Sequence, residues 1–437
     1  MFGLFRPRCP VSTLEKASVE FAYLTIRDVV GIEPLLQSAT VVPEEELGET
    51  RPCTELLLRK MVALVCHNME LDTSQFSFEP RTDENANDDH TDLAQIRYSE
   101  GEPIDPRLIV PLLAVRIGRL KMQQCRLEPK DPTTNWWVTH LLPNYYGFGL
   151  FAANATIKAS NWSFGETGYS EIKRHSEVTS RVHAYSLALN AWCRDAPEAE
   201  WLPTLRPDAA EPFSQALTFL QKTGDSAFQV NDKTEMRYRA IQSIAEDLRK
   251  GNPSAKVVAL WQLTERTDAN SLQTDIEKCL FDRDPAVRAT GLRVVAKSET
   301  VSDRCQDRIA AALADTALEV RRESLPACRQ HLDVDDHLVE SVARLLDERD
   351  LGLSRESIDT LVSFGEEATS ALPRIAKAMK QAMVSCNWDM AEILAEGIRK
   401  IGSDPQATIA KFFAHDADLE EQAIGVLNGD IHEVPDV

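Results

Sequence analysis

The 437-residue sequence predicts an α+β amino-terminal domain followed by an all-α solenoid. Three observations support this fold class. A helix-pair pattern recurs along the carboxyl-terminal half, the amino-terminal half mixes helical periodicity with short alternating segments, and a proline-containing stretch separates the two. We therefore expect the α+β domain over residues 1–195, a linker with one short helix over 196–233, and a solenoid of about five helix pairs over 234–437.

The amino-terminal domain should begin with two helices and three short strands. Apolar residues at helical spacing predict the helices over 12–30 and 56–69, and short β-branched or alternating segments predict the strands over 39–42, 75–79 and 93–99. The acidic, asparagine-rich stretch 81–92 has too few apolar residues to pack, so we expect a loop there.

Three longer helices should complete this domain. Asp105-Pro106 and Asp131-Pro132 each place a capping side chain before a proline, which suits a first helical turn because its missing N–H is not needed there. These helices should run to about residues 124 and 158, and a third should cover 169–192. Gly147 and Gly149 fall inside the second helix, where we expect close packing against a neighbouring helix.

The stretch 196–233 joins the two halves. Prolines interrupt its beginning, at 197, 203, 207 and 212, and a short helix is expected over 213–222. The following helix, over 234–248, carries apolar residues on one face. We expect it to cap the open amino end of the solenoid.

The carboxyl-terminal half repeats at spacings of 32 and 33 residues, within the range for two-helix repeats. One apolar position recurs in successive helices: Leu260, Leu292, Leu325 and Ile358. Because one helix pair cannot bury its apolar stripe alone, successive pairs must stack into a continuous core.

Two helix openings carry the repeat most clearly, Asp284-Pro285-Ala286-Val287-Arg288 and Leu318-Glu319-Val320-Arg321-Arg322. On these residues, the segment 252–427 resembles the HEAT-repeat family. The resemblance implies a scaffold that binds protein partners.

In each opening, an arginine follows the inward-facing valine: Arg288 in the first and Arg321 in the second. Its aliphatic stem should pack along the stacked helices. We expect the arginine to pair with an acid of a neighbouring repeat. The candidate acids are Asp282, Asp284 and Asp315. The alternative is a solvated surface arginine, for which an exposed ion pair contributes little.

Composition limits the classes of partner. The formal net charge is −21, which argues against nucleic acid or an anionic membrane as the main partner because both need clustered cations. The nine cysteines are scattered and contain no C-x-x-C pair, which fits the reducing cytoplasm. No apolar run approaches the roughly 18 residues of a membrane span. We therefore expect a cytoplasmic protein with no membrane span.

The amino-terminal half resembles a family of uncharacterised bacterial proteins. They share a Met-Phe-Gly-Leu-Phe head, a helix with an H-E-x-x-H zinc motif, and a Gly-hydrophobic-Gly-x-Phe-x-Ala-Asn stretch. The chain keeps the head at 1–5, Val138-Thr139-His140-Leu141-Leu142, and Gly147-Phe148-Gly149-Leu150-Phe151-Ala152-Ala153-Asn154. The resemblance implies a zincin-like domain.

The resemblance also implies that the metal helix has degenerated. The two ligand positions align with Val115 and Arg119, the base position with Arg116, and the third ligand with His140. Valine has no lone pair, and a guanidinium repels a dication. One remaining ligand does not hold a catalytic zinc, so we expect a pseudoenzyme domain with no metal, no cofactor and no catalytic residue.

Other catalytic signatures are absent from the sequence. It contains no H-E-x-x-H, no G-x-x-x-x-G-K-[ST], no G-x-G-x-x-G and no G-x-S-x-G. This absence favours binding over chemistry.

Aromatic residues crowd the helix expected after Asp131. The favoured interpretation is a large core contact, since positions 137, 141, 145, 148 and 152 follow helical spacing. The alternative is that the ancestral cleft persists as a ligand-binding pocket. Its residues would be Arg116, Arg119, His140, Trp137 and Tyr145. Two arginines one helical turn apart would suit an anion such as a peptide carboxylate.

The sequence therefore predicts a non-catalytic scaffold that holds unidentified protein partners through both halves. The alternative is an enzyme of unrecognised mechanism, with residual hydrolase-like activity or the lyase activity found in some HEAT-type proteins.

Overall fold

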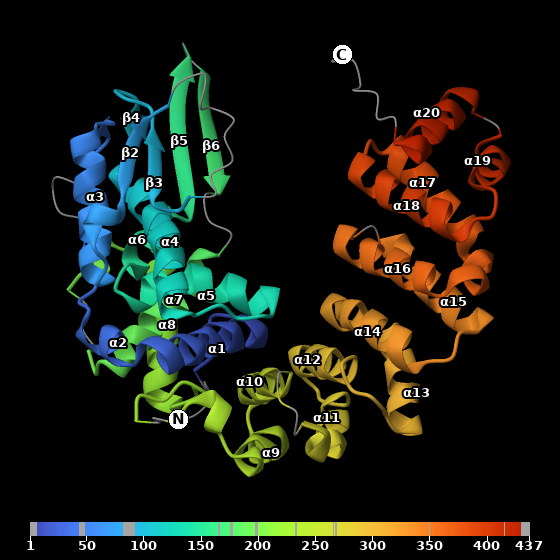
Figure 1. Cartoon of the computed structure of the whole chain (residues 1–437), viewed down its shortest axis with the longest axis horizontal. Helices are drawn as coiled ribbons and strands as arrows, with labels where there is room; N and C mark the ends of the chain where they lie inside the picture. The colour runs from blue at the N-terminus through green and yellow to red at the C-terminus, as the bar shows by residue number, and fades with distance from the viewer. Residues whose placement is uncertain are drawn as a thin grey trace. The chain divides into compact units, whose positions relative to one another are not determined.

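The computed structural model shows a mostly helical protein with a few short strands. It describes residues 7–42, 49–81, 92–164, 167–174, 178–196, 200–231, 234–264, 266, 269–348, 350–414 and 416–429. The chain forms two compact units, Met1–Ala240 and Ile241–Val437, each described below by itself (Figure 1). The head at 1–5 and most of the expected loop 81–92 lie outside the described residues.

The first unit contains eight α-helices within its described residues. They are α1 Thr13–Val30, α2 Glu33–Gln37, α3 Glu55–Asn68, α4 Pro106–Cys125, α5 Pro132–Tyr145, α6 Gly149–Ala155, α7 Ser180–Cys193 and α8 Pro207–Thr223. Side-chain caps start most of the long helices, as the sequence predicts. Ser12 forms a capping box with Glu15 at α1, while Asp105 and Asp131 cap α4 and α5 ahead of a proline.

The core of this unit is formed where α5 packs against α1, α4, α6 and α7, and where α7 packs against α8. Its largest side chains are aromatic. Tyr23, Tyr145, Tyr146, Tyr185, Phe148, Phe151 and Phe213 are each less than 2 % exposed. Burial of this much apolar surface is the main force that holds these helices together.

The strands form three separate pairs. β2 Ser77–Pro80 pairs in parallel with β3 Gln95–Tyr98, where two strands are expected from the sequence. β1 Arg51–Pro52 pairs antiparallel with β4 Pro103–Ile104. The third pair, β5 Ile157–Phe164 with β6 Thr167–Arg174, is antiparallel and includes residues 157–158 and 169–174, which were expected to be helical.

Two of the expected helices and one expected strand therefore differ from the structure. The helix from Asp131 does not run to residue 158, because α5 ends at Tyr145 and Gly147 adopts φ +94°, a conformation that breaks a helix. The third helix begins at Ser180 and not at 169. Residues 39–42 form no strand; the N–H of Val41 instead donates to the Gly147 carbonyl at 2.9 Å.

The two glycines of the aromatic stretch play different parts. At Gly147, an added Cβ would lie 2.4 Å from the Ala39 carbonyl oxygen, so the backbones approach closely there. At Gly149, it would lie 2.7 Å from Cδ2 of Leu187 on α7. Gly149 thus permits the close helix packing expected from the sequence, whereas Gly147 permits a turn.

The stretch expected to be a linker belongs to the first unit. Its helix α8 is longer than expected and starts at Pro207, because proline fits a first helical turn. The helix buries Ala209, Phe213, Ala216, Leu217 and Leu220, and it packs along α7. Prolines in this stretch therefore begin a core helix and do not mark a domain boundary.

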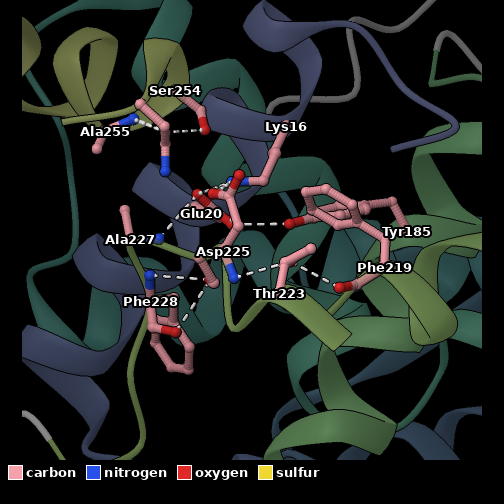
Figure 2. Close-up of polar contacts among 12 residues, drawn as sticks. Lys16, Glu20, Tyr185, Phe219, Thr223, Asp225, Ala227, Phe228, Ser254 and Ala255 are labelled. Atoms are coloured by element: carbon pink, nitrogen blue, oxygen red, sulfur yellow. Dashed lines mark hydrogen bonds and ion pairs between the residues drawn. The ribbon is translucent and has the colours of Figure 1, made fainter. Parts of the chain in front are cut away.

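The segment after α8 is held on α1 by a buried ionic network, shown in Figure 2. Nζ of Lys16 lies 3.0 Å from Oε1 of Glu20 and 3.1 Å from Oδ1 of Asp225. Glu20 also accepts from the Tyr185 hydroxyl at 2.7 Å and from the Ala227 N–H at 3.1 Å. Burial alone would lower the pKa of Lys16, but the two carboxylates raise it above its usual value.

The second unit is entirely helical in its described residues. Its helices are α9 Ile241–Lys250, α10 Pro253–Leu263, α11 Gln273–Cys279, α12 Pro285–Val295, α13 Asp303–Ala312, α14 Leu318–His331, α15 Asp336–Arg344, α16 Leu351–Ser363, α17 Leu372–Val384, α18 Trp388–Ile401, α19 Pro405–Phe413 and α20 Ala417–Asn428. The expected helix 234–248 is shorter, because 236–238 form a separate 3-10 turn and α9 starts at Ile241.

Alternate helices of this unit form one row, in which α10, α12, α14, α16, α18 and α20 each pack against the next (Figure 1). We call these the row helices. The repeating apolar position lies in successive row helices and is buried: Leu260, Leu292, Leu325 and Ile358 are at most 1 % exposed. The helices α9 and α11 pack at the start of the row, against α10 and α12 respectively.

Ion pairs repeat along the row with the same period. Nη2 and Nε of Arg288 lie 2.6 and 2.9 Å from the two carboxylate oxygens of Asp315, which confirms one of the pairings expected from the sequence. Lys256 pairs with Asp282 at 2.6 Å, and Arg321 pairs with Glu348. The Arg288 guanidinium holds the pKa of the Asp315 carboxyl below its usual value although burial opposes it. The pairs therefore tie α10, α12 and α14 each to the segment just before the next row helix.

Among the described residues, no helix combines the length and apolar character that crossing a membrane requires.

Candidate functional site

The first unit contains a cavity of about 750 Å³. Its lining comes from β3, from α4 between Leu108 and Arg119, from α5 and α6, and from His183 on α7. Most of the wall is apolar, including Leu112, Leu113, Phe148 and Ala152. Its volume is in the range of pockets that bind small molecules.

Charged side chains in the lining are mainly cationic. Among the described residues, four arginines and a single carboxylate line the cavity: Arg81, Arg97, Arg116, Arg119 and Glu102. This local excess of positive charge contrasts with the net charge of −21 for the whole chain. The apolar part of the wall has a low dielectric constant and strengthens the field of the charges beside it.

Arg116 binds backbone carbonyls just before β3 and at its first residue. Its Nε donates to the Leu93 carbonyl at 2.9 Å, and its Nη2 donates to the Asp92 and Gln95 carbonyls at 2.6 Å each. Burial lowers the pKa of Arg116, and nearby Arg119 lowers it further. The Arg116 side chain therefore has a structural task, which is to hold one wall of the cavity.

Arg119, one turn further along α4, is exposed. Within the described residues, no hydrogen bond or ion pair engages its guanidinium, and the same holds for the side chain of Arg81. Arg97 is largely buried, with its Nε 3.9 Å from a Glu79 carboxylate oxygen. Among the described residues, Arg116 and Arg97 are thus engaged by protein groups, whereas the guanidinium groups of Arg119 and Arg81 are not.

His140 lies on α5 with a defined tautomer. Its Nδ1 is 2.8 Å from the Trp136 carbonyl oxygen, which can only accept, so Nδ1 carries the proton and Nε2 of the neutral ring has the lone pair. The ring also stacks on Trp136, with centroids 4.4 Å apart. His140 is thus fixed in place and lines the cavity.

His183 lies on α7 at the inner end of a buried polar chain. Its Nδ1 is 3.0 Å from Nδ2 of Asn144, which also donates to the Ser186 hydroxyl at 2.9 Å. Burial lowers the pKa of His183 from 6.5 to about 3, and the nearby His140 contributes to this shift. His183 is therefore neutral at physiological pH.

The structure brings together three of the five residues expected to form a pocket. Arg116, Arg119 and His140 line the cavity, and Val115 lines it beside them. Trp137 and Tyr145 are not among its lining residues. Trp137 packs edge-on against Trp136, and Tyr145 is fully buried, with its hydroxyl donating to the Gly31 carbonyl at 2.8 Å. The core interpretation of the aromatic stretch therefore holds for Tyr145.

Sequence reasoning missed His183, Arg81 and Arg97 as cavity residues. His183 meets the cavity because α7 packs on α6 and α5, a tertiary arrangement that leaves no local signal. Arg97 and Arg81 could have been suspected from their place in and beside a predicted parallel strand pair, but only the fold shows which wall that pair forms.

No group of three or more His, Cys, Asp or Glu side chains in the described part of the chain is arranged to hold a metal ion. Comparison with protein-family models finds no match to this chain, and no curated protein matches it.

Proposed function

We propose that the protein is a non-catalytic interaction scaffold, in which a HEAT-type α-solenoid binds protein partners. The observation that carries this proposal is the uninterrupted row from α10 to α20, each helix of which packs on the next. Stacked repeats of this kind expose a long surface whose residues recur with the period of the repeat. Such a surface suits an extended protein partner.

One set of exposed residues follows that period. Leu318 and Leu351 are the first residues of α14 and α16, and they are 37 % and 43 % exposed. Two large apolar side chains at equivalent places on neighbouring row helices form one edge of the row. We propose that this edge contacts the partner, because exposed apolar groups in register mark interaction sites more often than scattered ones.

The first unit, in this proposal, is a degenerate zincin-like domain. Support comes from the cavity, whose lining includes Val115, Arg116, Arg119 and His140, the four positions that the resemblance assigns to metal ligands and base. Three of these side chains cannot ligate zinc. We further propose that the protein acts in the cytoplasm, since all nine cysteines are free thiols.

The scaffold proposal can be tested with the full chain immobilised and exposed to a cell lysate. The test variant is Leu318→Glu/Leu351→Glu, which replaces both exposed leucines. A glutamate in the first helical turn is favoured by the helix dipole, so the fold should be retained. The matched control is Val384→Glu, since Val384 is 69 % exposed but ends α17, outside the row.

We expect the wild type and Val384→Glu to retain the same protein, identified by mass spectrometry and confirmed by titration of the purified pair. The double variant should bind it at least about tenfold more weakly, as expected when central apolar contacts are replaced by charge. Equal retention by both variants would show that this edge is not the binding surface, and a chain that retains no protein saturably would contradict the scaffold function.

The second candidate function is an enzyme of unrecognised mechanism. Two imidazoles in one cavity favour it, because His140 is fixed by its Nδ1 contact with the Trp136 carbonyl and His183 is held neutral. Elemental analysis of the purified full chain tests the pseudoenzyme interpretation. Stoichiometric zinc would contradict the pseudoenzyme interpretation, since a bound metal would imply ligands supplied in spite of Val115 and Arg119.

A further inference from the structure

The cavity of the first unit has the chemistry of a site for an amphipathic anion. Its described lining is mainly cationic, whereas the whole chain carries more acidic than basic residues, 69 against 48. Four arginines around one cavity repel one another, and Glu102 is the single carboxylate among the described lining residues. A bound anion would remove this repulsion.

Two of these arginines have donors to offer. Arg116 uses Nε and Nη2 on backbone carbonyls, and Arg97 faces Glu79, so both contribute charge mainly at a distance. Arg119 and Arg81 are exposed, and no other described residue engages their guanidinium groups. A guanidinium that presents two parallel N–H groups fits a carboxylate better than it fits a single-atom anion.

The rest of the lining fits an apolar body. Leu108, Leu112, Leu113, Phe148, Ala152 and Ala155 come from α4, the turn after α5, and α6. Leu112 is 56 % exposed although it is a large apolar side chain in the middle of a helix. Contact with an apolar ligand would bury part of that surface.

We propose that this cavity binds an organic carboxylate with an apolar body, with Arg119 and Arg81 pairing with the carboxylate and the α4 and α6 walls enclosing the body. The ligand is a small molecule and not the partner of the row helices. The tests of this site are therefore independent of the tests of the scaffold function.

Calorimetric titration of the full chain tests the ligand class with three probes. Octanoate supplies both the carboxylate and an apolar body, octylamine reverses the charge, and acetate removes the body. We expect octanoate to bind saturably with one site. Octylamine should bind at least about tenfold more weakly because four arginines oppose it, and acetate should show no saturation.

Two variants test the assignment of the residues. Arg119→Gln should weaken octanoate binding about tenfold by removing a charge-assisted hydrogen bond, and Leu112→Glu should weaken it by adding a like charge at the cavity wall. Their matched controls are Arg181→Gln and Leu56→Glu, both at exposed helix positions outside the lining. The controls should bind octanoate as the wild type does, and all four proteins should keep the wild-type melting temperature.

Several results would overturn the proposal. Equal affinity for octanoate and octylamine would show an apolar cavity without anion selection. Unchanged octanoate binding in both Arg119→Gln and Leu112→Glu would place the ligand elsewhere, and no binding of octanoate at millimolar concentration would remove this ligand class. Competition by inorganic phosphate alone would indicate a simple anion site in which the apolar walls play no part.

Discussion

At the scale of single residues, the chain places unusual conformations and protonation states around the candidate site. Gly147 turns the chain between α5 and α6 with a left-handed backbone, and this turn brings Phe148 into the cavity lining. His183 closes the other side as a buried neutral imidazole. Both residues can be tested by substitutions that leave the rest of the cavity unchanged.

Gly147→Ala should destabilise the first unit more than a glycine substitution at a comparable backbone conformation. An alanine there pays the left-handed backbone penalty of about 1–2 kcal/mol and also meets the Ala39 carbonyl oxygen at 2.4 Å. The clash should add at least about 1 kcal/mol. Gly224→Ala is the control, since Gly224 also has positive φ but nothing lies within 4 Å of an added Cβ. Urea unfolding of the two variants provides the comparison, and equal losses of unfolding free energy would refute the close approach.

His183 should make the first unit sensitive to acid. The unfolded chain binds a proton on this ring below pH 6.5, whereas the folded ring stays neutral down to about pH 3. The unfolded state therefore holds more protons in that window, and the free energy of unfolding falls as the pH falls, by up to about 1.4 kcal/mol per pH unit. His183→Gln cannot bind this proton, so its stability should decline less between pH 6.5 and 4.

The control for that experiment is His67→Gln, at an exposed position on α3. Denaturant unfolding at several pH values should give the control the same pH profile as the wild type. A His183→Gln profile parallel to that of the wild type would mean that this imidazole is not buried in the neutral form.

At the scale of elements, the ion pairs between Lys256 and Asp282, Arg288 and Asp315, and Arg321 and Glu348 repeat with the stack. Ser354 occupies the next equivalent place, on α16, and its buried hydroxyl lacks a hydrogen bond within the described residues. This series of equivalent ion pairs therefore ends before α16. A different pair links α16 to α18, in which Nη1 of Arg355 lies 3.6 Å from Oε2 of Glu396.

A double-mutant cycle on Arg288→Met and Asp315→Asn should show that these pairs stabilise the row. Both side chains are at most 11 % exposed, so we expect a coupling energy of about 1–3 kcal/mol. The exposed pair Arg344 and Glu340 on α15 is the control, with a coupling of about 0.3–0.5 kcal/mol. Thermal or urea unfolding supplies the four free energies of each cycle, and similar couplings for the two pairs would exclude a special role for burial.

Sequence patterns predict those helices whose first turns carry their own signals. Capping side chains and prolines locate the starts of α1, α4 and α5 within a residue or two, and the 33-residue period locates α12, α14 and α16. The β5–β6 hairpin is not predicted, because its stability comes from pairing across the turn and not from a local preference.

The candidate site is predictable to a similar degree. Arg116, Arg119 and His140 can be found from the sequence because they align with the ligand and base positions of the family that the amino-terminal half resembles. All three line the cavity. Their separate roles cannot be found in this way. Arg116 binds backbone carbonyls because residues 92–95 pass close to it, whereas Arg119 binds none of them. The path of residues 92–95 is set by the strand pair and not by the helix that carries the arginines.

At the scale of the whole molecule, the boundary between the two units falls after Ala240, later than the end of the expected linker. Residues 225–236 belong with the first unit, because Asp225 and Ala227 bind the network of α1, and Arg27 donates to the Thr234 carbonyl at 2.8 Å. Phe228 adds a ring contact with Tyr23, with centroids 5.7 Å apart. The place of a segment in the sequence thus does not indicate which unit it stabilises.

Separate chains that end at this boundary should fold. We expect the fragments 1–240 and 241–437 each to unfold cooperatively in denaturant. A fragment that ends at residue 222 should be less stable than 1–240 by roughly 3–5 kcal/mol, because Lys16 and Glu20 lose buried partners. Equal stability of the fragments 1–222 and 1–240 would contradict the role assigned to the network, and a disordered 241–437 fragment would contradict the independence of the second unit.

The network on α1 can form only late in the synthesis of the chain. Lys16 leaves the ribosome early, but its partner Asp225 follows 209 residues later. At about 5–20 residues per second, this delay is roughly 10–40 s. During that interval, Lys16 lacks the Asp225 carboxylate and Glu20 lacks the Ala227 N–H that they bind in the finished protein. The first unit is therefore completed only when the chain has nearly reached the start of the second.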